Sequence, residues 1–134
     1  MSLQYMLLIY LDEQALTQEA RDECYGASTQ AAHRLNATGH YRACAPLYPT
    51  ATATSVRVRD GHKMVTDGPF AETREQLGGF FLIDARDLDE AIGIAAQLPA
   101  GQYGTVEVRP VVELPDLPQY FKDRNVDLAP PRST

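Results

Sequence analysis

Cysteine and histidine, the residues that hold most structural metals in proteins, are scarce in this sequence. Its 134 residues include two cysteines and three histidines. Cys24 and Cys44 form no CxxC motif, and no histidine pair stands at a spacing typical of zinc sites, so the sequence indicates neither metal nor redox chemistry. No Lys or Arg directly flanks either thiol to stabilise a thiolate, and we therefore expect two small, buried, apolar residues.

Basic residues are also in the minority. Twelve Lys and Arg stand against eighteen Asp and Glu, which gives a formal charge of −6, and the sequence has no basic run. A phosphate backbone would meet net repulsion from such a chain. We therefore expect no nucleic acid partner.

A long apolar segment is missing as well. The longest apolar run near the start, Tyr5 to Leu11, lacks a basic leader and ends at two acidic residues, so it is too short for a bilayer and wrongly flanked for a signal peptide. The chain also lacks a phosphate-binding loop and a dinucleotide fingerprint, since Gly78 and Gly79 alone do not make such a motif. We expect a cytoplasmic protein with no membrane partner and no cofactor.

The remaining composition is that of an ordinary globular domain. With 44% hydrophobic and 22% charged residues, the chain suits one domain with a packed core. Beyond Val112 prolines recur and no periodic apolar pattern follows. We therefore divide the chain into a domain over residues 1–114 and an arm or tail over residues 115–134, which Tyr120 and Phe121 could pin to the body.

Apolar periodicity predicts the first strand and the first helix. Tyr5 to Tyr10 is apolar on both alternating faces, as in a central strand. Thr17 is a suitable N-cap, and small and apolar residues then recur at helical spacing up to Gly39. The predicted core stripe of this helix is Ala20, Cys24, Ala27, Ala31 and Leu35.

Turn signals predict a second strand and a hairpin. Residues 40–48 form an extended segment that closes at Pro46 and Pro49. Residues 54–59 alternate cleanly, Asp60 and Gly61 supply a tight turn, and residues 63–66 return antiparallel.

The second half repeats the strand–helix–strand order. Residues 79–83 form an apolar strand, and Asp87 followed by Glu90 is a capping box that starts a helix at Leu88. Its predicted core face is Leu88, Ala91, Ile92, Ala95 and Leu98. A last strand is expected over residues 105–109, with Glu107 and Arg109 on one face.

This order predicts an α+β fold, a ferredoxin-like βαββαβ sandwich with an inserted β-hairpin. Right-handed crossovers would place both helices on one face of the sheet. Central strands that are apolar on both sides need a cover on the other face, and a second copy of the chain can supply it. We therefore expect a homodimer.

The segment Asp67 to Gly79 gathers ionisable residues around glycines and a proline. Loops near this length in a compact domain are more often functional than mere connections. The motif DGPFAET within it, followed by EQLGG, DLDEA and GTVEVRP, resembles the DGPF-motif branch of the YCII-related proteins. The resemblance runs from about Leu3 to Leu114 and includes YMLLIY, GHYRA and ATSVRVRDG.

The resemblance implies a ferredoxin-like subunit that pairs into a dimeric α+β barrel. Family members are largely described as uncharacterised, and some are encoded near alternative sigma factors. For other YCII-type proteins the resemblance implies a catalytic pair, formed by a histidine near the start of the first helix and an aspartate. Residues 17–24 contain no histidine, so that pair is not carried over.

Candidate chemistry therefore rests on the loop and on the last strand. Asp67 could cap its own turn, or act as a base beside the apolar Phe70. Glu72 and Thr73 could cap a short helix through Leu77, or Glu72 could form an acid/base pair with Asp67.

Other residues are candidates for substrate binding. Glu107 and Arg109 could be a surface ion pair, or Arg109 could bind a substrate carboxylate while Glu107 orients it. His40 and Tyr41 are possible neighbours, and Phe70 and Thr73 complete the set. Two functions stay open: a cofactor-free enzyme acting on a small, anionic molecule, and a non-catalytic dimeric module that binds a ligand or a protein.

Overall fold

The computed structural model describes residues 3–118, and they form a mixed α+β fold. Its main sheet has the strand order β2-β5-β1-β6, and all three pairings are antiparallel. The central strands are β1 (Leu3–Leu11) and β5 (Gln76–Ala85), and the edge strands are β2 (Tyr41–Pro46) and β6 (Gly104–Pro110). Two short 3-10 turns, η1 (Thr50–Thr52) and η2 (Pro99–Gln102), lie between the main elements.

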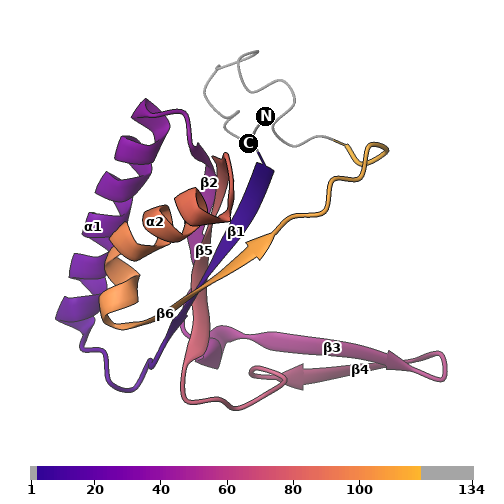
Figure 1. Ribbon diagram of the computed structural model, residues 1–134. Coiled ribbons are helices and arrows are strands. Elements are labelled where there is room, and N and C mark those ends of the chain that lie inside the picture. The colour runs from indigo at the N-terminus through magenta and orange to yellow at the C-terminus, as the bar shows by residue number, and fades with distance from the viewer. Residues whose placement is uncertain (1–2, 119–134) are drawn as a thin grey trace, which may run out of the picture.

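Both helices lie against one face of this sheet (Figure 1). They are α1 (Gln18–Ala37) and α2 (Leu88–Gln97). Side chains alternate along a strand, so Tyr5, Leu7 and Ile9 of β1 point together into the core beneath the helices. Neither helix, within residues 3–118, has the length and apolar composition that a membrane crossing requires.

Local capping explains where the helices begin. The Thr17 hydroxyl accepts a hydrogen bond from the Ala20 amide at 3.0 Å, as predicted for the start of α1. Asp87 accepts from the Glu90 amide at 2.9 Å, and the Glu90 carboxylate reaches back to the Arg86 amide at 3.0 Å. The second bond reaches one residue further back than in the usual capping box.

The face of the sheet opposite the helices is also apolar at its centre. Met6 and Leu8 of β1 alternate with the core residues, and the strand register pairs them with Leu82 and Phe80 of β5. Leu82 is buried although it points away from the helices. This surface, made by Met6, Leu8, Phe80 and Leu82, is called the open sheet face below.

The inserted hairpin forms a separate two-stranded sheet of β3 (Thr54–Arg59) and β4 (His62–Asp67). Positive φ angles at Asp60 (52°) and Gly61 (76°) confirm the predicted tight turn. The hairpin extends from the lower end of the main sheet, away from the helix layer (Figure 1).

Several boundaries differ from the sequence prediction because distant strands pair. β1 and β5 are longer than predicted, since Tyr10 and Leu11 pair with Leu77 and Gln76 beyond a register shift. The connection after the hairpin therefore covers only residues 68–75, and no helix forms through Leu77. The second strand ends at Pro46 and not near residue 48, and one further bond, from the Leu47 amide to the Gly78 carbonyl at 2.9 Å, follows it.

The predicted core face of α2 was partly wrong. Ala91, Ala95 and Leu98 are buried, but Leu88 and Ile92 are about half exposed, and Ile94 is buried in their place. The helix is therefore turned so that residues 91, 94, 95 and 98 face the sheet.

Two further expectations concern the cysteines and the tail. Cys24 is buried as predicted, and its burial raises the pKa of the thiol, whereas Cys44 is only partly buried. β2 is an edge strand, which leaves Cys44 one open side. Tyr120 and Phe121, the predicted anchors of the tail, lie outside the described residues.

Candidate functional site

A groove of about 570 Å³ opens where the hairpin leaves the main sheet. Its size falls within the range of about 300–1,000 Å³ typical of small-molecule sites. Its walls come from the end of β1, the β2–β3 connection, the start of β3 and residues 69–77. A second cavity, between α1 and the sheet beside Cys24 and Cys44, measures about 110 Å³ and is too small for a comparable ligand.

Aromatic rings and hydroxyl groups dominate the groove. Its most characteristic lining residues are Tyr10, Tyr48, Phe70, Thr50, Ser55 and Thr73. Tyr48 and Phe70 are 84% and 79% exposed, which is unusual for large rings unless they contact something outside the chain. The groove can therefore hold a flat apolar group beside these rings. The hydroxyls of Thr50, Ser55 and Thr73 already donate within the chain, so their oxygens can accept hydrogen bonds from the polar atoms of such a group.

Hydrogen bonds hold both rims of the groove in place. The Glu13 carboxylate accepts bonds from the Thr50 amide (3.0 Å) and the Thr50 hydroxyl (2.7 Å), which fixes the β2–β3 connection to the chain after β1. On the other rim, the Thr73 hydroxyl donates to the Glu75 carbonyl at 2.6 Å, and the side-chain Nε2 of Gln76 donates to the Thr73 carbonyl at 2.8 Å. Local bonds thus form this turn, and the short helix through Leu77, one of the two alternatives above, does not form.

A smaller, polar hollow of about 330 Å³ adjoins the groove and shares Thr50, Thr73 and Gln76 with it. Asp12 and Arg74 lie at its edge as a weak ion pair, with 3.6 Å between Asp12 Oδ2 and Arg74 Nε. Arg74 is almost fully exposed, so its charge is free to move toward a ligand. The groove is thus mainly apolar and the adjoining hollow is lined by charged residues, so a ligand that spans both would meet an apolar and a charged surface.

The two carboxylates predicted for acid/base chemistry lie beside the groove and not in its wall. Asp67 ends β4 and Glu72 lies in the loop, and both are exposed. Within residues 3–118 neither carboxylate takes part in a hydrogen bond or an ion pair. The Gly68 amide, which could have been capped by Asp67, donates instead to the Ala53 carbonyl at 2.7 Å. Phe70 and Thr73, by contrast, line the groove, and their role in binding stays a prediction.

Tyr10 connects the groove with the last strand. Its hydroxyl donates to Glu107 Oε1 at 3.3 Å. Burial and the Glu107 carboxylate raise the pKa of the Tyr10 phenol, which favours its neutral, hydrogen-bonding form. Arg109 projects from the same face of β6, opposite Met6, and forms no ion pair with Glu107 within the described part of the chain.

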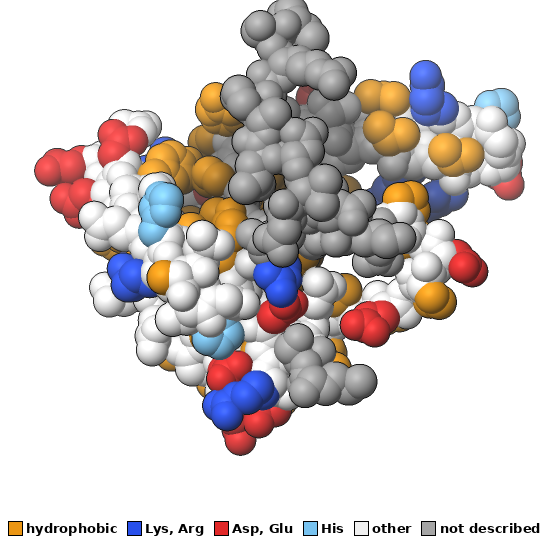
Figure 2. Space-filling model, turned by 90° about the horizontal axis from the view of Figure 1, so that it is seen from above, with side chains coloured by type: hydrophobic (Ala, Val, Ile, Leu, Met, Phe, Trp, Pro, Cys, Tyr) orange, Lys and Arg blue, Asp and Glu red, His pale blue; other side chains and the backbone are white. Residues whose placement is uncertain are grey.

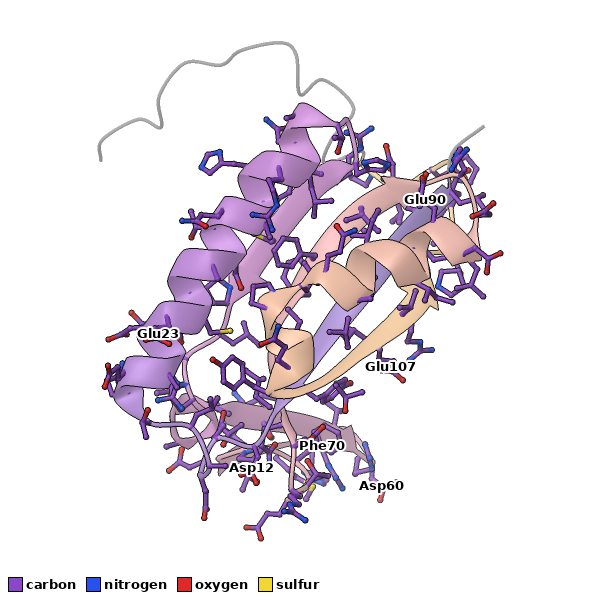
Figure 3. All side chains as sticks on the ribbon, turned by 60° about the vertical axis from the view of Figure 1, so that its left-hand side comes forward. Asp12, Glu23, Asp60, Phe70, Glu90 and Glu107 are labelled. Atoms are coloured by element: carbon purple, nitrogen blue, oxygen red, sulfur yellow. The ribbon has the colours of Figure 1, made fainter. Side chains whose placement is uncertain are left out.

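His40 and Tyr41 lie at the other end of the sheet. The His40 carbonyl accepts a hydrogen bond from the Asp84 amide at 2.8 Å, near the end of β5, whereas the groove lies at the start of that strand. A rise of roughly 3.3 Å per residue separates these ends by on the order of 25 Å. Figure 3 shows Phe70 and Asp12 at the hairpin end and Glu90, whose carboxylate is 3.3 Å from His40 Nε2, at the opposite end.

Sequence reasoning missed most of the groove. Tyr10 was placed in a central strand, Tyr48 at the end of another, and Thr50 and Ser55 were given no role. An aromatic residue between two prolines was the available signal for Tyr48, since such a position is extended and exposed. No group of three or more His, Cys, Asp or Glu residues able to hold a metal ion occurs among the described residues.

These features define a small α+β protein with a groove built by a motif loop and the base of a projecting hairpin. The chain belongs to the YCII-related family, whose domain model matches residues 3–115. It is also 39% identical over 112 residues to an uncharacterised protein of Rhizobium meliloti (strain 1021), a match that covers 80% of this chain and 90% of that protein.

Proposed function

We propose that this protein binds a small molecule with a flat apolar part and at least one polar or charged group in the groove beside the motif loop. The observation that carries the proposal is the position of Phe70. This ring of the DGPFAET motif is almost fully exposed, yet it lies on the wall of the groove together with Tyr10 and Tyr48. The adjoining Arg74 supports an anionic group as the polar part.

Titration with 8-anilinonaphthalene-1-sulfonate, an aromatic anion whose fluorescence rises in apolar sites, tests this proposal. Phe70→Ala and Tyr48→Ala are each expected to weaken binding by about tenfold, because each removes one aromatic wall. Tyr103→Ala is the matched control, since Tyr103 is also a partly exposed ring but does not line the groove. Equal losses in all three variants, or none, would show that the dye binds elsewhere.

A second proposal is acid/base catalysis on the bound molecule by Asp67 and Glu72. The observation in its favour is that both carboxylates are unengaged within residues 3–118. An exposed carboxylate is a weak base at neutral pH. The proposal therefore requires that ligand or partner removes water from the pair.

Incubation of the protein with a soluble small-molecule extract, followed by mass spectrometry, tests the catalytic proposal. The double variant Asp67→Asn, Glu72→Gln is expected to abolish any depletion that the wild type causes while keeping the wild-type melting temperature. Asp60→Asn at the hairpin tip is the control. Depletion that persists in the double variant would contradict the assignment.

We further propose that the subunit is ferredoxin-like and forms a dimeric α+β barrel through the open sheet face. The strand order β2-β5-β1-β6 and the position of both helices on one face support this arrangement. The apolar Met6, Leu8 and Phe80 are only partly buried and give a second copy a surface to cover, next to the buried Leu82. The cytoplasmic location stays a prediction of the sequence.

A further inference from the structure

The β3–β4 hairpin has little in its own chain to hold it. It forms a two-stranded sheet that pairs with no other strand among residues 3–118. Every residue of β4 and all but Ser55 in β3 are exposed. Isolated two-stranded hairpins are marginally stable at best in water. A hairpin of this length therefore needs a surface to pack on.

One side of the hairpin is suited to such packing. The strand register pairs Val56 with Val65 and Val58 with Lys63, which puts these four side chains on one face. Val56, Val58 and Val65 are 59%, 61% and 55% exposed. This valine face, defined by the three valines, is a continuous exposed apolar strip of the kind that interfaces cover.

The charge of the hairpin is opposite to that of the rest of the chain. Residues 54–67 hold three of the twelve basic and two of the eighteen acidic residues, so they carry +1 and the remaining residues carry −7. Figure 2 shows hydrophobic and basic side chains next to one another along the projecting hairpin. Lys63 lies on the same face as the valines, whereas Arg57 and Arg59 project from the other face of the hairpin. The positive charge at Lys63 favours a partner surface with an acidic group beside Val58, and the rest of this chain is acidic.

The direction of the hairpin also favours a second copy. It extends away from the helix layer, on the side of the open sheet face (Figure 1). A molecule that covers the open sheet face is therefore within reach of the hairpin. In a two-fold dimer each copy would offer one hairpin and receive one, so a single contact is used twice.

We propose that the β3–β4 hairpin is an arm whose valine face packs against the body of a second copy of this chain. The inference rests on the dimer proposed above and assigns to it a second contact, separate from the open sheet face. The arm contact would also lie next to the groove, because Ser55, at the base of each arm, lines the groove of its own subunit.

Hydrogen exchange at two protein concentrations tests the arm in the wild-type protein. Amides of residues 56–65 are expected to be protected where the protein is dimeric and to exchange at least about tenfold faster after dilution to the monomer. Amides of β1 and β5 pair within one chain and serve as the internal control. Equal exchange of the arm in dimer and monomer would overturn the proposal.

Variants separate the arm from the open sheet face. The double variant Val56→Lys, Val65→Lys is expected to raise the dimer dissociation constant in sedimentation equilibrium by about tenfold or more. Met64→Lys, on the opposite face of the same hairpin, is expected to change it by less than about threefold. All three sites are exposed, so folding should survive. If the valine variant leaves the dimer dissociation constant unchanged, the arm contact is wrong but the dimer proposal stands. If the wild type is monomeric, both proposals are wrong. The dye titration tests ligand binding in the groove in either case.

Discussion

At the scale of single residues, Glu90 joins the start of α2 to the start of β2. Its carboxylate accepts from the Arg86 amide (3.0 Å) and from Arg86 Nε (2.9 Å) at the start of α2. His40 Nε2, just before β2, lies 3.3 Å from Glu90 Oε1, the same oxygen that accepts from the Arg86 amide. The bond from the Arg86 amide is the main reason that the pKa of Glu90 lies below its usual value.

The lowered pKa of Glu90 gives a pH-dependent prediction. A carboxyl whose pKa falls on folding stabilises the native state above its unfolded pKa of about 4.3, and this contribution disappears as the pH falls through the folded value. Glu90→Gln is therefore expected to lower the melting temperature at pH 7 and to have little effect near pH 3. Thermal melts at both values measure this. Asp89→Asn, an exposed neighbour in the same helical turn, is the control. If Glu90→Gln lowers the melting temperature equally at both pH values, the charge argument is wrong.

At the scale of elements, the contact between β2 and β5 depends on the absence of a side chain at Gly79. A Cβ atom there would lie 2.8 Å from the Ala45 carbonyl oxygen, which is backbone and cannot rotate away. Gly79→Ala is expected to destabilise the fold by about 1–3 kcal/mol. Gly93 in the middle of α2 has open space around its Cβ position, and Gly93→Ala is expected to stabilise by about 0.5–1 kcal/mol.

Urea unfolding of both glycine variants measures these differences. The same glycine-to-alanine change is expected to lower the free energy of unfolding at Gly79 and to raise it at Gly93. Gly79 is needed for the close contact between strands, whereas Gly93 only weakens a helix. A Gly79→Ala protein as stable as the wild type would mean that β2 can move away from β5 without cost.

Elements whose determinants are local were predicted well from the sequence. The hairpin turn depends on Asp60 and Gly61, and the helix starts depend on Thr17 and Asp87, each within a few residues of the bonds they make. The start of β5 was missed because Gln76 joins the strand only through Leu11, far away in the sequence. Local patterns carry no information about such a pairing.

The candidate site was less predictable for the same reason. The motif loop was identified, and Phe70 and Thr73 do line a groove. The opposite wall, with Tyr10, Tyr48 and Thr50, comes from segments whose proximity depends on the fold and on the Glu13 bonds. His40 and Tyr41 were named as possible neighbours of Glu107 and Arg109, and they lie at the end of the sheet away from the groove. Sequence spacing does not reveal which end of a sheet a residue occupies.

At the scale of the whole molecule, the proposed dimer predicts how thermal stability depends on protein concentration. Association stabilises the folded state by mass action, so the melting temperature of a dimer rises with concentration. Leu8→Lys places a charge at the centre of the open sheet face, between Phe80 and Glu107 in the register. This variant is expected to be monomeric and to melt at a temperature that does not depend on concentration.

Ile92→Lys is the matched control for Leu8→Lys, because it adds the same charge at a half-exposed apolar site on α2, in the layer on the other side of the sheet. It should keep the concentration dependence of the wild type. Scanning calorimetry over about a hundredfold range of concentration distinguishes the two. If Ile92→Lys abolishes the dependence and Leu8→Lys keeps it, the subunits associate through their helices, and the open sheet face must be covered within one chain.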